Sequence, residues 1–319
     1  MRWMDYEKPI IGLAPMADFT DLPFCRLIRE CGAQQTVIFR EMVSAEALVR
    51  GNKKTLKSLD IHASERPVVQ QLFGSDPQAM AEAALIVEKR VKPEGLDINM
   101  GCPVHKAVSN FNGASLMREP DKASQIIRAM KSAVSVPLSV KTRLGWSRPD
   151  EILKFAKSVE DAGADALEVH GRTKDQGYAG RADWQMVGRV VKEVKIPVLV
   201  NGDIVDTQTA QQALVVSGAA GLLIGRGALG HPWIFQEISA SLSGHGTLEQ
   251  PSIQQKMAYL RRHAELQIEH YGQNGLIKLR KHFPWYFKGI PGFRQFRAQA
   301  VRITTLNELE ELIETIGRT

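Results

Sequence analysis

The chain has 319 residues, of which 44% are hydrophobic and 24% charged, and carries a formal net charge of +6. This is globular composition, sufficient for one large barrel with an appendage or for two medium domains. The three cysteines, Cys25, Cys31 and Cys102, have no zinc-binding spacing, and their odd number argues against a disulfide framework.

Neither export nor membrane insertion is indicated by the sequence. The amino terminus, MRWMDYEKP, has no apolar region of the kind found in signal peptides, and no run of 18 or more apolar residues occurs. We therefore expect a cytoplasmic protein in a reducing compartment, with no membrane association and no bound metal. We also expect a monomer.

From Pro9 onward, short β-rich runs alternate with helical patterns that end in glycine. In the first helical pattern, Phe24, Leu27, Ile28 and Cys31 fall on one face, and Gly32 follows as a cap, which makes Cys25 and Cys31 packing residues. Eight such runs predict a parallel sheet closed into a (β/α)8 TIM barrel. The predicted strands are 10–16, 36–43, 67–74, 95–101, 137–143, 165–172, 197–203 and 221–226. An open doubly wound sheet is the alternative, but its GxGxxG fingerprint is missing.

The pattern changes after Pro232. The serine- and glycine-rich loop at 241–247 and then Pro251 indicate a linker, and no strand signal follows. Helical periodicity covers 253–271, 275–288, 292–303 and 307–316. We therefore expect two domains, a catalytic barrel at 1–242 and a small all-helical domain at 243–319.

The basic character of the chain belongs to this helical region. Between Lys256 and Arg302 there are ten Lys or Arg against two acids, Glu265 and Glu269, a net charge of +8. Aromatic residues alternate with these charges, at Tyr259, Tyr271, Phe283, Trp285, Tyr286, Phe287, Phe293 and Phe296. We interpret the aromatic residues as the core of a small domain and the charges as a surface for RNA phosphates.

In a TIM barrel the active site lies at the carboxyl ends of the strands, so the residues at these ends are the candidates for function. They are polar in almost every strand: Pro15 and Met16, Glu41, Gln71, Asn99 and Cys102, Lys141 and Arg143, His170 and Arg172, Asn201 to Asp203, and Gly225 and Arg226. A barrel with a purely structural role would not need them there. Cys102 lies at a corner between Gly101 and Pro103, and it is either a packed cysteine at a strand end or a reactive group.

Two groups of these residues suggest a bound cofactor. The turns Asn201-Gly202-Asp203 and Gly225-Arg226-Gly227 follow strands seven and eight, where TIM barrels commonly bind phosphate. Gln71, Lys141 and His170 offer donors suited to a flat heterocycle, so the set fits flavin mononucleotide. For Lys141 the alternative is an ion pair inside the barrel with Asp97 or Glu168.

Seven segments resemble those of the tRNA-dihydrouridine synthases, and the resemblance extends over essentially the whole chain. They are APMADFTDLPF (14–24), QLFG (71–74), DINMGCPVHK (97–106), VKTRLGW (140–146), VHGRTKDQGY (169–178), VNGDI (200–204) and IGRGALGHPWIF (224–235), with LRKHFPWYFKG (279–289) in the helical part. The resemblance implies FMN as cofactor, NADPH as reductant, and reduction of the C5–C6 double bond of particular uridines in tRNA.

The resemblance also implies roles for single residues. Cys102 would be the acid that protonates C5, and Asn99, Lys106, Arg143 and Arg172 would lie on the substrate side. The flavin would be held by Gln71, Lys141, His170, Asn201, Gly202, Asp203, Gly225 and Arg226, with the backbone of Pro15 and Met16 under its ring. A thiol with a pKa near 8.5 is mostly protonated at neutral pH, so Cys102 suits the role.

Two positions depart from the family pattern. Asp18 stands where glycine is usual, and the loop 109–115 (SNFNGAS) lacks the glycine-rich spelling. Two other functions are compatible with parts of the sequence, namely a flavin barrel that reduces a small pyrimidine or enone and a non-catalytic RNA-binding barrel. The first leaves the charge distribution unexplained, and the second leaves the strand ends unexplained.

Overall fold

The computed structural model describes residues 3, 7–102, 113–246, 248–290 and 293–317. They form two compact units that are not the two expected segments. The first unit consists of Met1–Asp21 and Gln35–Gly225, and the second of Leu22–Gln34 and Arg226–Thr319. The expected boundary at residues 242 and 243 thus lies inside the second unit, which also takes a helix from the first part of the chain.

The first unit is a closed barrel of eight parallel strands. The strands pair in chain order, and β8 returns to β1, with Ile10 opposite Gly221 and Leu13 opposite Ile224. They are β1 (Ile10–Leu13), β2 (Val37–Ser44), β3 (Val68–Phe73), β4 (Gly95–Met100), β5 (Leu138–Arg143), β6 (Ala166–His170), β7 (Val198–Asn201) and β8 (Gly221–Ile224). The TIM barrel is confirmed and the open sheet is wrong, because the edge strands β1 and β8 pair with each other.

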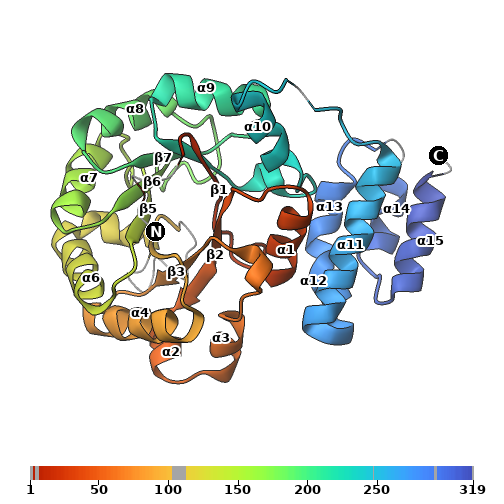
Figure 1. Cartoon of the computed structure of the whole chain (residues 1–319), viewed down its shortest axis with the longest axis horizontal. Coiled ribbons are helices and arrows are strands. Elements are labelled where there is room, and N and C mark those ends of the chain that lie inside the picture. The colour runs from red at the N-terminus through yellow and green to blue at the C-terminus, as the bar shows by residue number, and fades with distance from the viewer. Residues whose placement is uncertain (1–2, 4–6, 103–112, 247, 291–292, 318–319) are drawn as a thin grey trace. The chain divides into compact units, whose positions relative to one another are not determined.

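Helices surround the barrel, as Figure 1 shows for α4 and α6 to α9. The helices of this unit are α2 (Ala45–Val49), α3 (Lys53–Ser58), α4 (Pro77–Val91), α6 (Pro120–Ala133), α7 (Glu151–Asp161), α8 (Trp184–Glu193) and α9 (Thr207–Ser217), with 3-10 turns η2 (Ala63–Glu65) and η3 (Gly113–Arg118). Helix α4 begins at an N-cap, since the Asp76 side chain accepts from the backbone N–H of Ala79 and Pro77 occupies the first turn.

The interior of the barrel is apolar near the strand starts and polar toward the strand ends. An apolar cluster joins Trp3, Ile10, Ala14, Val37, Phe39, Val69, Ala166, Leu199 and Leu223. Because side chains alternate along a strand, the residues two positions further on the same face also point inward. In β3, β6 and β7 these residues are Gln71, Glu168 and Asn201. The polar end of the interior is therefore the carboxyl end, where TIM barrels carry their sites.

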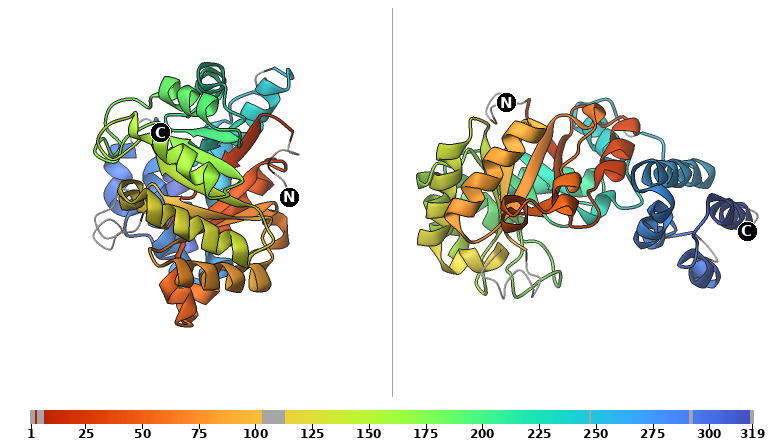
Figure 2. Two further views of the ribbon diagram at one scale, coloured as in Figure 1. Left: turned by 90° about the vertical axis from the view of Figure 1, so that its left-hand side faces the viewer. Right: turned by 90° about the horizontal axis from the view of Figure 1, so that it is seen from below.

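The second unit is entirely helical within the described residues. Its helices are α1 (Leu22–Glu30), α10 (Ile234–Leu242), α11 (Ile253–Tyr271), α12 (Gly275–Leu279), α13 (Phe283–Tyr286), α14 (Phe293–Ala300) and α15 (Leu306–Gly317), with 3-10 turns η4 (Arg226–Ala228), η5 (Gly272–Asn274) and η6 (Arg280–His282). Figure 2 (right) shows the helices from α11 onward, in blue, packed against one another.

Helix α1 belongs to this unit because its apolar face packs on α11. The Phe24 ring lies 5.5 Å from the ring of His263 and 5.4 Å from that of His282. Two ion pairs also join α1 to α11. Arg26 of α1 pairs with Glu269 at 2.6 Å, and Arg262 of α11 pairs with Glu30 at 2.7 Å. Cys25 and Cys31 are buried as expected, and burial raises the pKa of the Cys31 thiol to about 12.

Candidate functional site

The corner after β4 is held by the side chain of Asn99. Its Oδ1 accepts from the backbone N–H of Gly101 at 3.2 Å and of Cys102 at 3.0 Å. From the other side, the Ala114 N–H donates to the Cys102 carbonyl at 3.2 Å, beside Gly113, whose φ of 62° is in the left-handed region. A Cβ on Gly113 would meet the Cys102 carbonyl oxygen at 3.0 Å, so glycine is needed there for both reasons. Cys102 is half-buried, unlike Cys25 and Cys31.

Inward residues of β5 and β7 meet at the polar end of the barrel. Asn99 of β4 is the register partner of Lys141 in β5. The Lys141 ammonium donates to Asn201 Oδ1 at 3.1 Å, and Asn201 Nδ2 donates to the Leu223 carbonyl at 2.8 Å. Within the described residues Lys141 forms no ion pair with Asp97 or Glu168, so the alternative expected for this residue is absent.

The pKa of Lys141 is lower than that of an ordinary lysine. Burial, assisted by the nearby charge of Arg143, lowers its pKa to about 8, although Asp97 and Glu168 act in the opposite direction. Among the residues that the structure describes, this ammonium donates one hydrogen bond, and its further donors suit an anionic or carbonyl-rich ligand.

The turn after β7 is fixed by Arg172. The guanidinium donates to both carboxylate oxygens of Asp203, at 2.9 and 2.8 Å, and to the carbonyls of Ala179 and Gly180. Gly202 has φ 113°, and a Cβ there would meet the His170 ring at 2.7 Å. Asp203 and Arg172 therefore hold the loop beside His170, and the expected contacts of both residues with cofactor or substrate stay predictions.

Arg143 is likewise engaged with the backbone. It is buried, and its guanidinium donates to the carbonyls of Gly101 at 2.8 Å, Thr173 at 3.1 Å and Gly177 at 2.8 Å. The same group lies 5.6 Å from the ring of Tyr178, which is 58% exposed. Arg143 thus connects the Cys102 corner with the loop after β6, and its expected substrate contact stays a prediction.

The other expected residues lie at the ends of β1 and β8 or outside the described chain. Pro15 and Met16 are half-buried, and a Cβ on Gly225 would lie 3.6 Å from the Met16 sulfur. Arg226 opens the second unit in η4. Lys106 lies outside the described residues, as do residues 109–112 of the loop at 109–115.

Sequence reasoning missed the interactions that connect the buried polar residues Gln71, Asp97, Ser139 and Glu168 inside the barrel, which we call the inner polar layer. Asp97, Ser139 and Glu168 are fully buried, and Gln71 Nε2 and Ser139 Oγ both donate to the Asp97 carboxylate, at 2.6 and 2.8 Å. Asp97 and Asn99 alternate along β4 with the apolar residues Leu96, Ile98 and Met100, and this alternation was the available signal. It predicts that both point inward, but not which neighbours they meet.

The comparisons with known proteins identify the family. A family model described as Dihydrouridine synthase (Dus) matches residues 12–318. The chain belongs to the dihydrouridine synthase family. The resemblance seen in the sequence is confirmed, and so is the expectation of an oxidoreductase enzyme of this family.

Two curated relatives match this chain along most of its length. A Synechocystis sp. protein named "Probable tRNA-dihydrouridine synthase 1" is 39% identical over 305 residues, covering 94% of this chain and 84% of the relative. A Pseudomonas aeruginosa protein named tRNA-dihydrouridine synthase B is 37% identical over 295 residues, covering 91% and 87%.

Solved structures are similar in fold. A 2-naphthoyl-CoA reductase complex has a TM-score of 0.54 at 14% identity, covering 73% of this chain and 50% of that one. Histamine dehydrogenase from Rhizobium sp. 4-9 has a TM-score of 0.55 at 12% identity, covering 80% and 48%. This dihydrouridine synthase therefore spans about half the length of those chains.

The second unit of this dihydrouridine synthase has an excess of positive charge that is partly neutralised by acids distant in the sequence. It contains 14 Lys and Arg against nine Asp and Glu. Arg261 pairs with Glu310 at 2.5 Å and Arg262 with Glu30, although neither acid lies between residues 256 and 302. Exposed Lys288, Arg297 and Arg302 have no ion pair with any residue that the structure describes.

Three of the eight aromatic residues noted in the sequence belong to the core of this unit, as interpreted, whereas Tyr259, Tyr271, Trp285 and Phe296 are half-buried. Phe283, Tyr286 and Phe287 are at most 2% exposed. Trp233 and Tyr259 stack with ring centroids 4.9 Å apart. No helix among the described residues is both long and apolar enough to cross a membrane.

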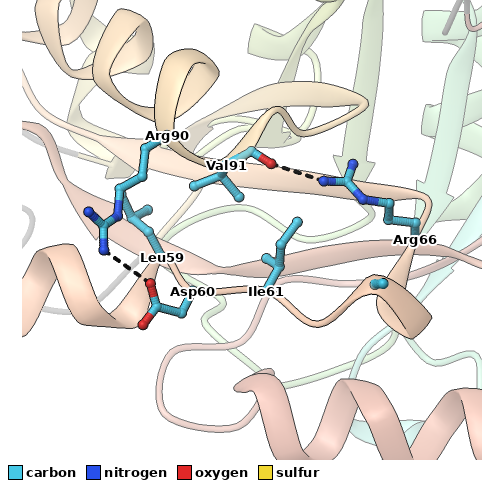
Figure 3. Close-up of a pocket in the computed structure, with 7 residues that line it drawn as sticks. Leu59, Asp60, Ile61, Arg66, Arg90 and Val91 are labelled. Atoms are coloured by element: carbon cyan, nitrogen blue, oxygen red, sulfur yellow. Dashed lines mark hydrogen bonds and ion pairs between the residues drawn. The ribbon is translucent and has the colours of Figure 1, made fainter.

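A cavity of about 570 Å³ lies at the opposite end of the barrel, before β3 and β4 (Figure 3). It is lined by Leu59, Asp60, Ile61, Ala63, Arg66, Arg90 and Val91. Its arginines are already engaged, since Arg66 donates to the Val91 carbonyl at 3.0 Å and Arg90 pairs with Asp60 at 3.2 Å. None of the expected site residues lines it, and in this fold that end serves stability.

Proposed function

We propose that this chain reduces the C5–C6 double bond of particular uridines in tRNA, with FMN as its cofactor, NADPH as reductant and Cys102 as the proton donor. The observation that carries the proposal is the position of the half-buried Cys102, joined through Asn99 to the ring of inward donors at the carboxyl end of the barrel. Family membership and the two curated relatives named tRNA-dihydrouridine synthase support the same substrate.

The residues at this end of the barrel fit a flavin. Gln71, Lys141, His170 and Asn201 supply amide, ammonium and imidazole groups over the inner polar layer, and such donors suit the carbonyls and ring nitrogens of an isoalloxazine. The backbone turns at Gly202 and Gly225 would contribute N–H groups to its phosphate, with Arg226 adding charge. When bound, the reduced flavin supplies the hydride that is added at C6 of the uracil.

The residues of the chain itself provide the proton and the orientation. In its thiol form Cys102 holds the proton that C5 requires, and the Asn99 oxygen fixes the backbone that carries the thiol. Lys141 contributes positive charge beside Asn201. Together they place a proton donor and a charged donor at one end of a shielded barrel.

The second unit is proposed to bind the tRNA. A uridine in a folded tRNA must leave its stack to enter the barrel, at a cost of about a few kcal/mol. Phosphate contacts by Lys288, Arg297 and Arg302 would offset this cost through counterion release.

The test uses tRNA from a strain that lacks this protein. The purified protein should show flavin absorbance, should be reduced by NADPH, and should convert specific uridines of that tRNA to dihydrouridine, as mapped by mass spectrometry. Comparable activity on free uridine would instead support the small-molecule reductase. Absence of flavin absorbance and of binding to added FMN would refute the cofactor assignment.

A further inference from the structure

A continuous chain of side-chain hydrogen bonds connects the buried carboxylate Asp97 to the Cys102 corner. Gln71 Nε2 donates to Asp97 Oδ2 at 2.6 Å, and Asn99 Nδ2 donates to Gln71 Oε1 at 2.9 Å. Asn99 Oδ1 then accepts from the backbone N–H of Gly101 and Cys102. Two side-chain amides in series therefore separate a buried charge from the backbone of the proposed proton donor.

The direction of this chain follows from the donor and acceptor inventory. An ionised carboxylate can only accept, so Gln71 must turn its NH2 group toward Asp97. The Gln71 oxygen is thereby aimed at Asn99, which must donate to it. The Asn99 oxygen is then free to accept from the backbone N–H groups of Gly101 and Cys102. In the opposite orientation, the Asn99 NH2 group would face these two donors.

The surroundings keep Asp97 as an acceptor. Ser139 Oγ donates to Asp97 Oδ1 at 2.8 Å, and the buried carboxyl group of Glu168 interacts electrostatically with Asp97. Burial, with the charge of Asp97 beside it, raises the pKa of Glu168 well above its ordinary value. Burial also raises the pKa of Asp97, to about 6, while the bonds from Gln71 and Ser139 oppose the increase. Of the two carboxyl groups, Glu168 therefore has the more strongly raised pKa, and Asp97 is the one that accepts from Gln71 and Ser139.

We propose that Asp97 is a positioning residue for the reaction, which fixes the amides of Gln71 and Asn99 in the one orientation that holds the Cys102 corner. The inference rests on the proposed function only for the role of Cys102. The relay, by which we mean the hydrogen bonds from Asp97 through Gln71 and Asn99 to the Cys102 corner, is a property of the barrel itself. Asp97 is fully buried, and its contacts lie within the inner polar layer.

The test measures hydrogen exchange of the Cys102 backbone amide in the full-length protein as purified. Labelling with 15N-cysteine yields three amide signals, from Cys25, Cys31 and Cys102. Asp97→Leu removes the acceptor that directs Gln71, and we expect Cys102 exchange to accelerate about tenfold, the usual effect of losing one hydrogen bond. The Cys31 amide, which donates to the Leu27 carbonyl in the other unit, should not change.

Two matched variants separate the relay from general loosening of the barrel. In Asp97→Asn the carbonyl oxygen can still accept from Gln71 while the NH2 group faces Ser139 Oγ, so exchange should stay within about threefold of wild type. Ser139→Ala removes the other bond to the same carboxylate but leaves Oδ2 to accept from Gln71, so Cys102 exchange should accelerate much less than in Asp97→Leu. Acceleration in Ser139→Ala equal to that in Asp97→Leu would overturn the proposal.

Activity provides the second measurement. Single-turnover reduction of tRNA uridine should slow in Asp97→Leu and recover in Asp97→Asn, with tRNA affinity unchanged. Unaltered Cys102 exchange in Asp97→Leu would refute the positioning role even if uridine reduction is confirmed. Accelerated exchange in a protein that never reduces uridine would refute the proposed function alone. If Asp97→Leu does not fold, Gln71→Met interrupts the same series of hydrogen bonds at its middle residue. Unchanged Cys102 exchange in Gln71→Met would then overturn the proposal.

Discussion

The Asn99 side-chain oxygen lies 3.0 Å from the backbone nitrogen of Cys102, three residues further along the chain. An asparagine at the end of a strand thus caps the corner that follows it, in the manner of an Asx-turn. The backbone that carries the thiol is therefore held by hydrogen bonds within the chain itself. This preorganisation allows a weak acid to serve as a positioned proton donor.

Replacement of Cys102 by Ala should separate chemistry from binding. We expect Cys102→Ala to retain FMN and its reduction by NADPH, while uridine reduction falls about 10²- to 10⁴-fold, the usual contribution of general acid catalysis. Single-turnover rates with tRNA provide the measurement. Cys25→Ala, which removes a buried thiol of α1, is the control. A Cys102→Ala rate equal to wild type would remove the thiol from the mechanism.

Flavin binding should weaken as Lys141 loses its charge. Because burial lowers its pKa to about 8, the free protein loses this ammonium as the pH rises through that value, and FMN affinity should fall between about pH 7 and 9. Titrations of the flavin-free protein across this range provide the measurement. Lys141→Met should bind FMN weakly at every pH, without the step, and Lys141→Arg should shift the step upward. A step that persists in Lys141→Met would assign the titration to another group.

The second unit should lose stability in mild acid. Burial lowers the pKa of His263 to about 3, assisted by the nearby charge of Lys281, and lowers that of His282 well below its ordinary value. Unfolded histidine takes up a proton below about pH 6.5, whereas the folded residues do not. The free energy of unfolding should therefore fall with decreasing pH below 6.5, by roughly 1 kcal/mol per pH unit for each histidine.

This loss can be assigned to the buried pair by substitution. His282→Phe should reduce the slope between pH 6.5 and 4.5 by about half, measured by denaturant unfolding at each pH. His245→Gln changes an exposed histidine of the same unit and should leave the slope unaltered. Equal slopes for wild type and His282→Phe would contradict the assignment.

Binding of tRNA should depend on three exposed cations of the second unit that have no ion pair within the described part of the chain. Charge reversal of Lys288, Arg297 and Arg302 together should weaken binding and reduce the slope of log affinity against log salt by about two to three. The flavin and its reduction by NADPH should be unaffected. Reversal of Lys53, Lys54 and Lys57, all exposed in α3 of the barrel, is the matched control. An unchanged salt slope in the triple variant would mean that other residues contact the phosphates.

The strands of the barrel and several helices of the second unit were predictable because their signals are local. Each strand is a short apolar run, and α11 begins at a Ser252 side chain that accepts from Gln255, so the expected range 253–271 agrees with the structure. The expected helix 275–288 is interrupted by η6 at Arg280–His282. Pro284 follows in the first turn of α13, and a proline cannot continue the hydrogen bonding of a preceding helix.

The site was predictable as a set of residues but not as a network. The alternation in β4 identifies Asp97 and Asn99 as inward, whereas their connection through Gln71 depends on the register between strands. Asp18 has φ 65°, a conformation that favours glycine, which matches the glycine usual at this position. Its backbone N–H donates to Glu41 at 2.8 Å, a contact that no periodicity indicates.

The assignment of α1 to the second unit has a consequence for synthesis on the ribosome. Leu22–Gln34 is made early, but α11, on which α1 packs, begins more than 200 residues later. The apolar face of α1, with Phe24, Leu27 and Ile28, must therefore remain without its partner while most of the barrel emerges. Contacts so distant in sequence form slowly, and exposed apolar surface favours aggregation in the meantime. Nascent chains stalled before α11 should bind chaperones through this helix.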